Sequence, residues 1–213
     1  MKLSTIIDWT GLISFITLLS HLTIDFNWNR ELLYSMIYLL PIALFCADLL
    51  SGMIHWICDS FGSSDTYLWG AIVEPFRSHH KDPSNIVKIP LSENLGVSCL
   101  LGSLLLSAIT ILDETFHHDQ WTCFLILFIV LSVLSNLFHR WAHISIKNRP
   151  PWLRLLQRLR IAISPEEHLV HHRTPHRNNY CIMCGWANIL TNRVNWSRIE
   201  HVLDKIGIKT NFD

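Results

Sequence analysis

Apolar residues gather in four long stretches that contain no Asp, Glu, Lys or Arg. These stretches are residues 9–24, 32–47, 95–112 and 120–138, and the second continues past Asp48 as far as residue 58. A helix needs roughly 20 mostly apolar residues to cross the hydrocarbon layer of a membrane. The pattern therefore predicts an all-α integral membrane protein with about four transmembrane helices.

The charged residues divide between the two sides that four crossings would create. If the first residue lies in the cytoplasm, the cytoplasmic segments hold all of the 17 Lys and Arg residues except Arg30. The opposite loops carry acidic residues instead: Asp25, Glu31, Asp113, Glu114 and Asp119. Because positive charge near a helix end resists translocation, this division predicts that both termini are cytoplasmic.

The rest of the composition narrows the class of protein. The 17 basic residues balance 17 acidic ones, which excludes a basic nucleic-acid-binding protein. Residues 152–163 place apolar side chains at helical spacing on one face and Arg154 and Arg158 on another. We expect there either a helix in the headgroup plane or a helix packed on a cytoplasmic lobe. No Gly/Ser-rich linker interrupts the chain, so residues 1–213 are expected to form one domain.

Histidine is unusually frequent, with 13 residues. The predicted topology places nine of them at or beyond the cytoplasmic ends of the helices: His55, His79, His80, His139, His143, His168, His171, His172 and His176. The other four, His21, His117, His118 and His201, are expected to be surface or interface residues. Nine histidines on one side predict a His-rich helical cap that holds a metal site.

The spacing of these histidines supports a shared site. His139 and His143 are four residues apart, as are His55 and Asp59, so each pair shares one face of a helix. His79 and His80 are adjacent, and on a regular helix they would diverge by about 100°. Either the backbone is irregular there or the two side chains serve different metal ions.

The residue types limit the metal chemistry. Imidazole suits Zn, Cu, Fe and Ni, but one zinc ion takes only about four ligands, so nine histidines fit two ions better. Zinc peptidase chemistry is disfavoured because Arg140 follows His139, where an HExxH motif needs Glu. Cys181 and Cys184 form a lone CxxC pair and are expected to pack in the interior. A redox dimetal centre at a bilayer surface suggests O₂ chemistry on an acyl or alkyl chain.

At these residues the sequence resembles the Kua lipid desaturase family, which includes plasmanylethanolamine desaturase and bacterial carotenogenesis regulators. The matching blocks, in order, are residues 47–59 with Gly62, then 75–83, 136–143, 164–176 and 180–188. The likeness extends over residues 35–205. Plant-type desaturases that make a trans-3 acyl chain in phosphatidylglycerol are more distant members.

The resemblance implies a membrane desaturase with a His-ligated di-iron centre that uses O₂. In plasmalogen-forming members a 1-O-alkyl (plasmanyl) chain becomes a vinyl ether, and the electron donor is a protein of the cytochrome b5 or ferredoxin type. One position departs from that subgroup, because Ile89 stands where its members carry a His. The Asn94-Leu95 step is more similar to the plant type, so the plant-type acyl-lipid reaction is the alternative.

The resemblance implies roles for individual residues. The nine cytoplasmic histidines are expected to be iron ligands, with His176 as the ninth member of the set. Asp59 is expected to be a ligand or to accept a hydrogen bond that fixes a ligand imidazole. Asp48 is a candidate catalytic residue together with Asp59, because an ionisable group inside the membrane is costly to keep.

Two other classes of protein carry similar histidine patterns. A fatty-acid or sterol hydroxylase would add oxygen to the lipid instead of removing hydrogen. A metal transporter or sensor would place its ligands along a path at mid-membrane, whereas these histidines cluster beyond the predicted helix ends. Product analysis and metal analysis separate these classes.

Overall fold

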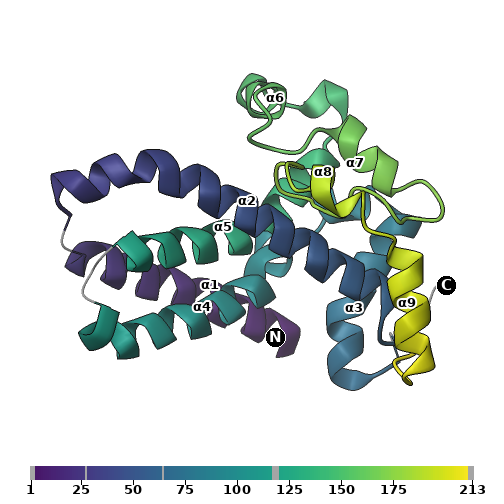
Figure 1. The fold of residues 1–213 in the computed structure, drawn as a ribbon, viewed down its shortest axis with the longest axis horizontal. Helices are drawn as coiled ribbons and strands as arrows, with labels where there is room; N and C mark the ends of the chain where they lie inside the picture. Colours follow the sequence, from purple (N-terminus) through teal and green to yellow (C-terminus); the bar gives the residue numbers. More distant parts are fainter. Residues whose placement is uncertain (1–2, 27, 64, 117–119, 211–213) are drawn as a thin grey trace. The chain divides into compact units, whose positions relative to one another are not determined.

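The computed structural model describes residues 3–26, 28–63, 65–116 and 120–210. Expectations for Lys2, His117, His118 and Asp119 fall outside these ranges. The described helices are α1 Leu3–Asp25, α2 Arg30–Ser60, α3 Tyr67–Lys81, η1 Asn85–Val87, α4 Leu91–Phe116, α5 Gln120–Ala142, η2 Ile146–Asn148, α6 Pro151–Arg158, α7 Pro165–His171, α8 Asn188–Thr191 and α9 Trp196–Lys205 (Figure 1). Over the described ranges there is no strand, only one isolated bridge between Phe61 and Thr210, so the all-α prediction is confirmed.

Among the described residues, four helices are long and apolar enough to cross a membrane. They are Leu3–Ile24, Arg30–Ser60, Leu91–Ile111 and Gln120–Ala142, which confirms the four predicted helices as candidate membrane spans. The first begins at Leu3, well before the apolar run at residue 9, because the helix continues through Asp8. Large apolar side chains such as Ile13, Ile37 and Leu104 lie on the outside of these helices. Exposed apolar surface of this kind suits contact with lipid, and it indicates a membrane protein.

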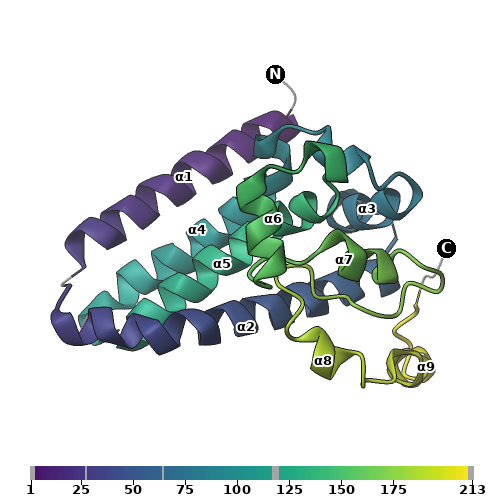
Figure 2. The ribbon, with the colours of Figure 1, turned by 90° about the horizontal axis from the view of Figure 1, so that it is seen from above.

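The chain forms two compact units, and α2 and α5 contribute residues to both. The first unit consists of residues 1–47 and 89–137. In this unit α1 and α4 lie side by side (Figures 1 and 2) and approach most closely at Gly11 and Gly96. A side chain at either glycine would overlap backbone atoms of the other helix, and small residues are what allow membrane helices to pack this closely.

The second unit consists of residues 48–88 and 138–213. It joins the last turns of α2 and α5 to α3 and to the short helices α6–α9, which loops connect (Figure 2). α7 begins at a favourable N-cap, where the Ser164 side chain accepts a hydrogen bond from the Glu167 amide, and Pro165 occupies the first helical position. These local signals place two histidines, His168 and His171, on one short helix, and His172 is its C-cap residue.

The helix predicted over residues 152–163 is shorter than expected. α6 ends at Arg158, because the chain turns at Arg160, whose φ is +56°. Ile163 leaves the helical face and donates its backbone N–H to the Met183 carbonyl. Trp152 and Leu155 remain exposed on α6. The prediction is therefore wrong for the second half of the segment and correct for the first.

Candidate metal centre

Nine side chains with metal-binding atoms converge in the second unit as two groups. The five-histidine group consists of His79, His139, His143, His168 and His172, and the Asp59 group consists of His55, Asp59, His80 and His171. Within each group the candidate ligand atoms all lie within 4.8 Å of one another. Eight of the nine histidines predicted from the sequence are thus brought together with Asp59. They lie on α2, α3, α5 and α7 or, for His143 and His172, directly after α5 and α7.

Several Nε2 atoms of the five-histidine group lie almost in contact. The His168 Nε2 lies 2.9 Å from that of His139, 3.0 Å from that of His143 and 3.0 Å from that of His172. A neutral Nε2 is either one donor or one acceptor, so it cannot bond well to three other nitrogens at once. Ligands at right angles around one metal ion, with bonds of about 2.1 Å, lie about 3.0 Å apart. The spacing therefore fits a shared metal ion better than a network of hydrogen bonds.

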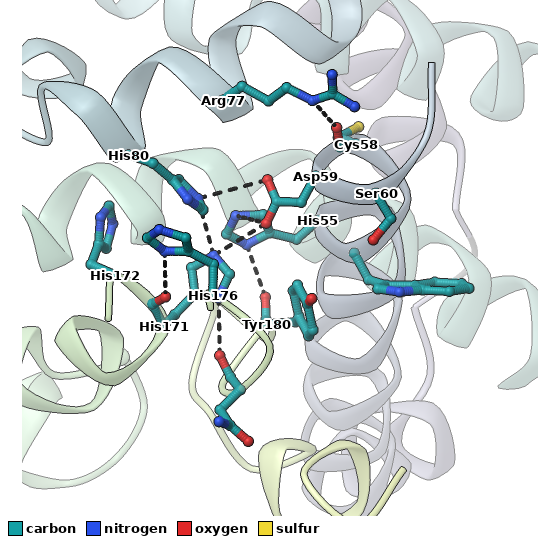
Figure 3. A network of polar contacts seen from close by, with 12 residues as sticks. His55, Cys58, Asp59, Ser60, Arg77, His80, His171, His172, His176 and Tyr180 are labelled. Atoms are coloured by element: carbon teal, nitrogen blue, oxygen red, sulfur yellow. Dashed lines mark hydrogen bonds and ion pairs between the residues drawn. The ribbon is translucent and has the colours of Figure 1, made fainter. Parts of the chain in front are cut away.

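The candidate ligand atoms of the Asp59 group also lie close together. The Asp59 carboxylate lies 3.3 Å from the His171 Nε2, 3.6 Å from the His55 Nε2 and 3.7 Å from the His80 Nε2 (Figure 3). The His55 Nε2 is buried and has no hydrogen-bond partner within the described ranges. Three imidazoles around one carboxylate match the donor set of an iron, zinc or other imidazole-binding ion.

The adjacent pair His79 and His80 divides between the two groups. α3 is a regular helix through both residues, and their rings are 84° apart with centroids separated by 4.5 Å. His79 therefore belongs to the five-histidine group and His80 to the Asp59 group. Of the two alternatives that the sequence leaves open, the structure has the regular backbone and two separate groups.

Burial keeps His79, His143 and His172 neutral. Burial, followed by the charges of neighbouring histidines, lowers the pKa of His79 to about 2 and that of His172 to about 3. The same causes lower the pKa of His143 to about 4. Neutral imidazoles keep their lone pairs available at neutral pH, as metal binding requires.

Backbone carbonyls fix the tautomer of two histidines in the Asp59 group. The His55 Nδ1 donates to the Tyr180 carbonyl at 3.1 Å, and the His171 Nδ1 donates to the Asn178 carbonyl at 2.9 Å. A proton on Nδ1 leaves Nε2 as the atom with the free lone pair, directed at Asp59. The loop of residues 178–188 thus orients two candidate ligands. This role cannot be recognised from the side chains of the loop, because backbone carbonyls perform it.

Asp48 anchors this loop. Its Oδ1 accepts hydrogen bonds from the amides of Met183, Cys184 and Gly185 at 3.0–3.1 Å, and its Oδ2 accepts one from Ala187 at 2.9 Å. The side chain is fully buried and lies outside both histidine groups. The geometry favours a positioning role for Asp48, and a catalytic role for it stays a prediction.

The remaining predicted residues lie away from the two groups. His176 stands outside both, with its ring 4.5 Å from that of His80 and its Nδ1 donating to the His171 carbonyl. Among the histidines expected on the surface, His21 and His201 are exposed. Cys181 and Cys184 are buried free thiols, as expected of packing residues.

Two cavities in the second unit open on the groups. One, of about 320 Å³, adjoins His143, His168 and His172 and is otherwise lined mainly by apolar residues such as Ile144 and Leu169. The other, of about 390 Å³, adjoins Asp59 and His80 and is lined by cationic side chains.

Comparison with known proteins extends these findings. The model of the lipid desaturase domain matches residues 44–212. The mouse plasmanylethanolamine desaturase 1 is 32% identical over 165 residues, which cover 74% of this chain and 60% of the relative. The chloroplast fatty acid desaturase 4 of Arabidopsis thaliana is 34% identical over 157 residues, which cover 73% of this chain and 48% of the relative.

A bacterial protein is similar to the chain at a comparable level of identity. The plasmanylethanolamine desaturase of Myxococcus xanthus is 34% identical over 146 residues, which cover 67% of this chain and 50% of the relative. The matched part of the chain thus spans about half the length of these curated relatives. No solved structure matches the chain. The family match over most of the sequence shows that the chain belongs to the lipid desaturase family.

Proposed function

We propose that the chain is an O₂-dependent lipid desaturase with a His-ligated di-iron centre, acting on the 1-O-alkyl chain of a plasmanyl phospholipid to form a vinyl ether. The observation that carries the proposal is the convergence of eight imidazoles and one carboxylate in two groups, within a chain of the lipid desaturase family. Two relatives are plasmanylethanolamine desaturases by name, which supports the ether-lipid substrate.

The two groups would each hold one iron ion. His79, His139, His143, His168 and His172 would hold one, and His55, Asp59, His80 and His171 the other. Iron with O₂ supplies the oxidising power needed to remove hydrogen from an unactivated carbon chain. His55 and His171 present Nε2 because the loop carbonyls hold their Nδ1 protons. His176, outside both groups, is proposed as a neighbour of the centre and not as its ninth ligand.

The overall reaction balances with one external reductant. Two hydrogens leave adjacent carbons of the lipid chain, two electrons and two protons come from outside, and O₂ becomes two molecules of water. The electrons require a donor, which we propose to be a protein of the cytochrome b5 or ferredoxin type. The cavity beside His143, His168 and His172 fits the lipid chain, since most of its other lining residues are apolar, among them Ile144 and Leu169.

A second candidate reaction is desaturation of an acyl chain in the manner of the plant enzymes. The supporting observation is the 34% identity to the chloroplast fatty acid desaturase 4, a level similar to that of the plasmanylethanolamine desaturases. A hydroxylase with the same histidine groups is the third. The three reactions leave different products, which are a vinyl ether, a new acyl double bond and an added hydroxyl group.

The proposal also includes the extent of the domain and its orientation in the membrane. We propose that residues 1–213 form one domain whose termini and metal centre lie on the cytoplasmic side, which the positive-inside distribution of Lys and Arg favours. A centre on that side would be accessible to a soluble or membrane-anchored electron donor. Labelling of cysteines introduced at the two termini, in intact cells, tests this orientation.

The decisive experiment is lipid analysis of cells with and without the chain, together with iron measurement on the purified protein. We expect acid-labile vinyl ethers and two iron ions per chain. His171→Ala should abolish the product while the protein stays in the membrane, and His201→Ala, an exposed histidine on α9, serves as the matched control. A chain that binds a single zinc ion and no iron would refute the proposal, and a new trans-acyl species would favour the second candidate.

A further inference from the structure

The proposed chemistry assigns no role to the cationic cavity of the second unit. Its volume is about 390 Å³, and its lining includes Arg77, Lys81 and Arg177 together with His80 and Asp59 of the Asp59 group. We infer that this cavity binds the phosphate group of the lipid substrate. The inference rests on the proposed function, because it assigns the headgroup end of the same substrate.

The charges of the cavity are only partly balanced. The Arg177 guanidinium lies 3.0 Å from the buried Glu200 carboxylate, which offsets its charge. The Asp59 carboxylate faces three imidazoles at 3.3–3.7 Å and belongs to the candidate metal group. Lys81 is exposed at the cavity, and Arg77 acts on the Asp59 carboxylate only through its charge, without an ion pair among those of the described residues. The balance therefore favours an anion.

Arg77 is held in place by the end of α2. Its Nε donates to the Cys58 carbonyl at 3.1 Å (Figure 3). Its Nη2 donates to the carbonyls of Phe61 and Gly62 at 3.0 and 3.2 Å. These bonds fix the plane of the guanidinium beside the cavity while Nη1 makes no hydrogen bond to the described residues. An arginine fixed in this way is suited to bind a phosphate oxygen.

The position of the cavity fits the place of reaction on the lipid. In a 1-O-alkyl phospholipid, about six covalent bonds separate phosphorus from the first carbon of the alkyl chain, which reach roughly 7–8 Å when extended. A desaturase that acts on this carbon must therefore hold the phosphate close to its metal centre. The cavity satisfies this requirement because Asp59 and His80 form part of its wall. A desaturase acting at mid-chain would need no cationic cavity at that point.

A binding experiment without turnover tests the inference. The purified, iron-loaded protein in detergent is titrated, without reductant, with dihexanoyl phosphatidylethanolamine, with dihexanoylglycerol and with inorganic phosphate. We expect the phospholipid to bind more tightly than the neutral diacylglycerol. Lys81→Glu should weaken phospholipid binding about tenfold and leave diacylglycerol binding unchanged, and Lys81→Arg should restore it. Lys205→Glu, an exposed lysine on α9 away from the cavity, should bind like the wild type.

The ratio of the two lipid affinities within each variant separates lost phosphate contact from damage to the fold, since damage weakens both. Equal affinities for phospholipid and diacylglycerol in the wild type, or an unchanged ratio in Lys81→Glu, overturn the inference. Binding of inorganic phosphate without binding of the phospholipid also overturns it. A Lys81→Glu variant that changes only the KM for the electron donor identifies a docking site for an acidic protein instead. If binding depends on the phosphate group but the protein makes no desaturated product, the phosphate site in the cavity is supported and only the proposed reaction is refuted.

Discussion

Replacement of Asp48 by Asn tests whether a buried carboxylate controls the metal centre from a distance. Asp48→Asn keeps the size of the side chain and retains one acceptor oxygen. Its new amide group would face either the Ala187 amide or the three amides that now share Oδ1, because both oxygens of the carboxylate are in use. At least one hydrogen bond to an ionised acceptor is lost, and the others become neutral.

The magnitude follows from these four bonds. A hydrogen bond to a charged group contributes about 1.5–3 kcal/mol and roughly twice a neutral one, so the loop of residues 178–188 should lose about 3–5 kcal/mol of local stability. The same loop provides the carbonyls that orient His55 and His171. Loss of such orienting bonds typically lowers metal affinity about 10- to 100-fold. We therefore expect Asp48→Asn to lose iron from the Asp59 group and to retain it in the five-histidine group.

Two measurements check this expectation on the purified protein. Hydrogen exchange of the amides at residues 183–187 should accelerate roughly 100-fold or more. Elemental analysis should find the iron content reduced from two ions per chain to about one. Asp204→Asn is the matched control, because Asp204 also accepts hydrogen bonds from a backbone amide and a side chain, both of Thr210, far from the histidine groups in sequence and outside them in space.

One result would refute the positioning argument. If Asp48→Asn keeps two iron ions and wild-type amide exchange but loses all turnover, then Asp48 acts in the reaction itself, as its place inside a membrane helix first suggests. A variant with normal iron, normal exchange and normal turnover would show that the four hydrogen bonds are dispensable.

Three further predictions concern the same unit. His143→Ala should lower the iron content by about one ion per chain, whereas His176→Ala should leave it unchanged, and elemental analysis distinguishes this from a ninth ligand. Gly52→Ala should destabilise the protein by about 1–3 kcal/mol, seen as a lower thermal midpoint, because the new Cβ would lie 2.5 Å from the sulfur of the cysteine that packs against it. Glu200→Gln should cost about 1–3 kcal/mol in the same assay, since the buried carboxylate pairs with arginine and accepts two side-chain hydrogen bonds. Glu166→Gln, which removes an ion pair of 3.7 Å whose carboxylate is exposed, should change the midpoint little, and equal losses in the two glutamate variants would contradict this reasoning.

The membrane helices could be predicted from sequence because one physical requirement dominates them. Hydrocarbon excludes charge, so the four apolar runs had to appear, and the structure has them with shifted ends. The shift at the N-terminus arises because Asp8 is buried against Gly96 and does not end the helix. The end of α6 could not be predicted, because the bond from Ile163 to Met183 joins residues far apart in sequence.

The loop that orients two candidate metal ligands was also beyond prediction. Its acceptors are the carbonyls of Asn178 and Tyr180, and every residue has a carbonyl, so no residue type marks them. Asp48 did carry a signal, since a carboxylate inside an apolar run is unusual. That signal indicated importance but not the partners, which are backbone amides about 135 residues further along the chain.

The division of the ligands into two groups follows a rule that helical geometry explains. Residues four apart on a helix differ by about 40° in direction, and each such pair shares a group: His139 with His143, His55 with Asp59, and His168 with His172. Neighbours differ by about 100°, and both adjacent pairs separate: His79 from His80, and His171 from His172. α3 and α7 therefore each contribute to both groups, so a displacement of either helix must disturb both sets of ligands together. The spacing of the histidines thus determines which ligands can share an ion, while the loop anchored by Asp48 determines how two of them are directed.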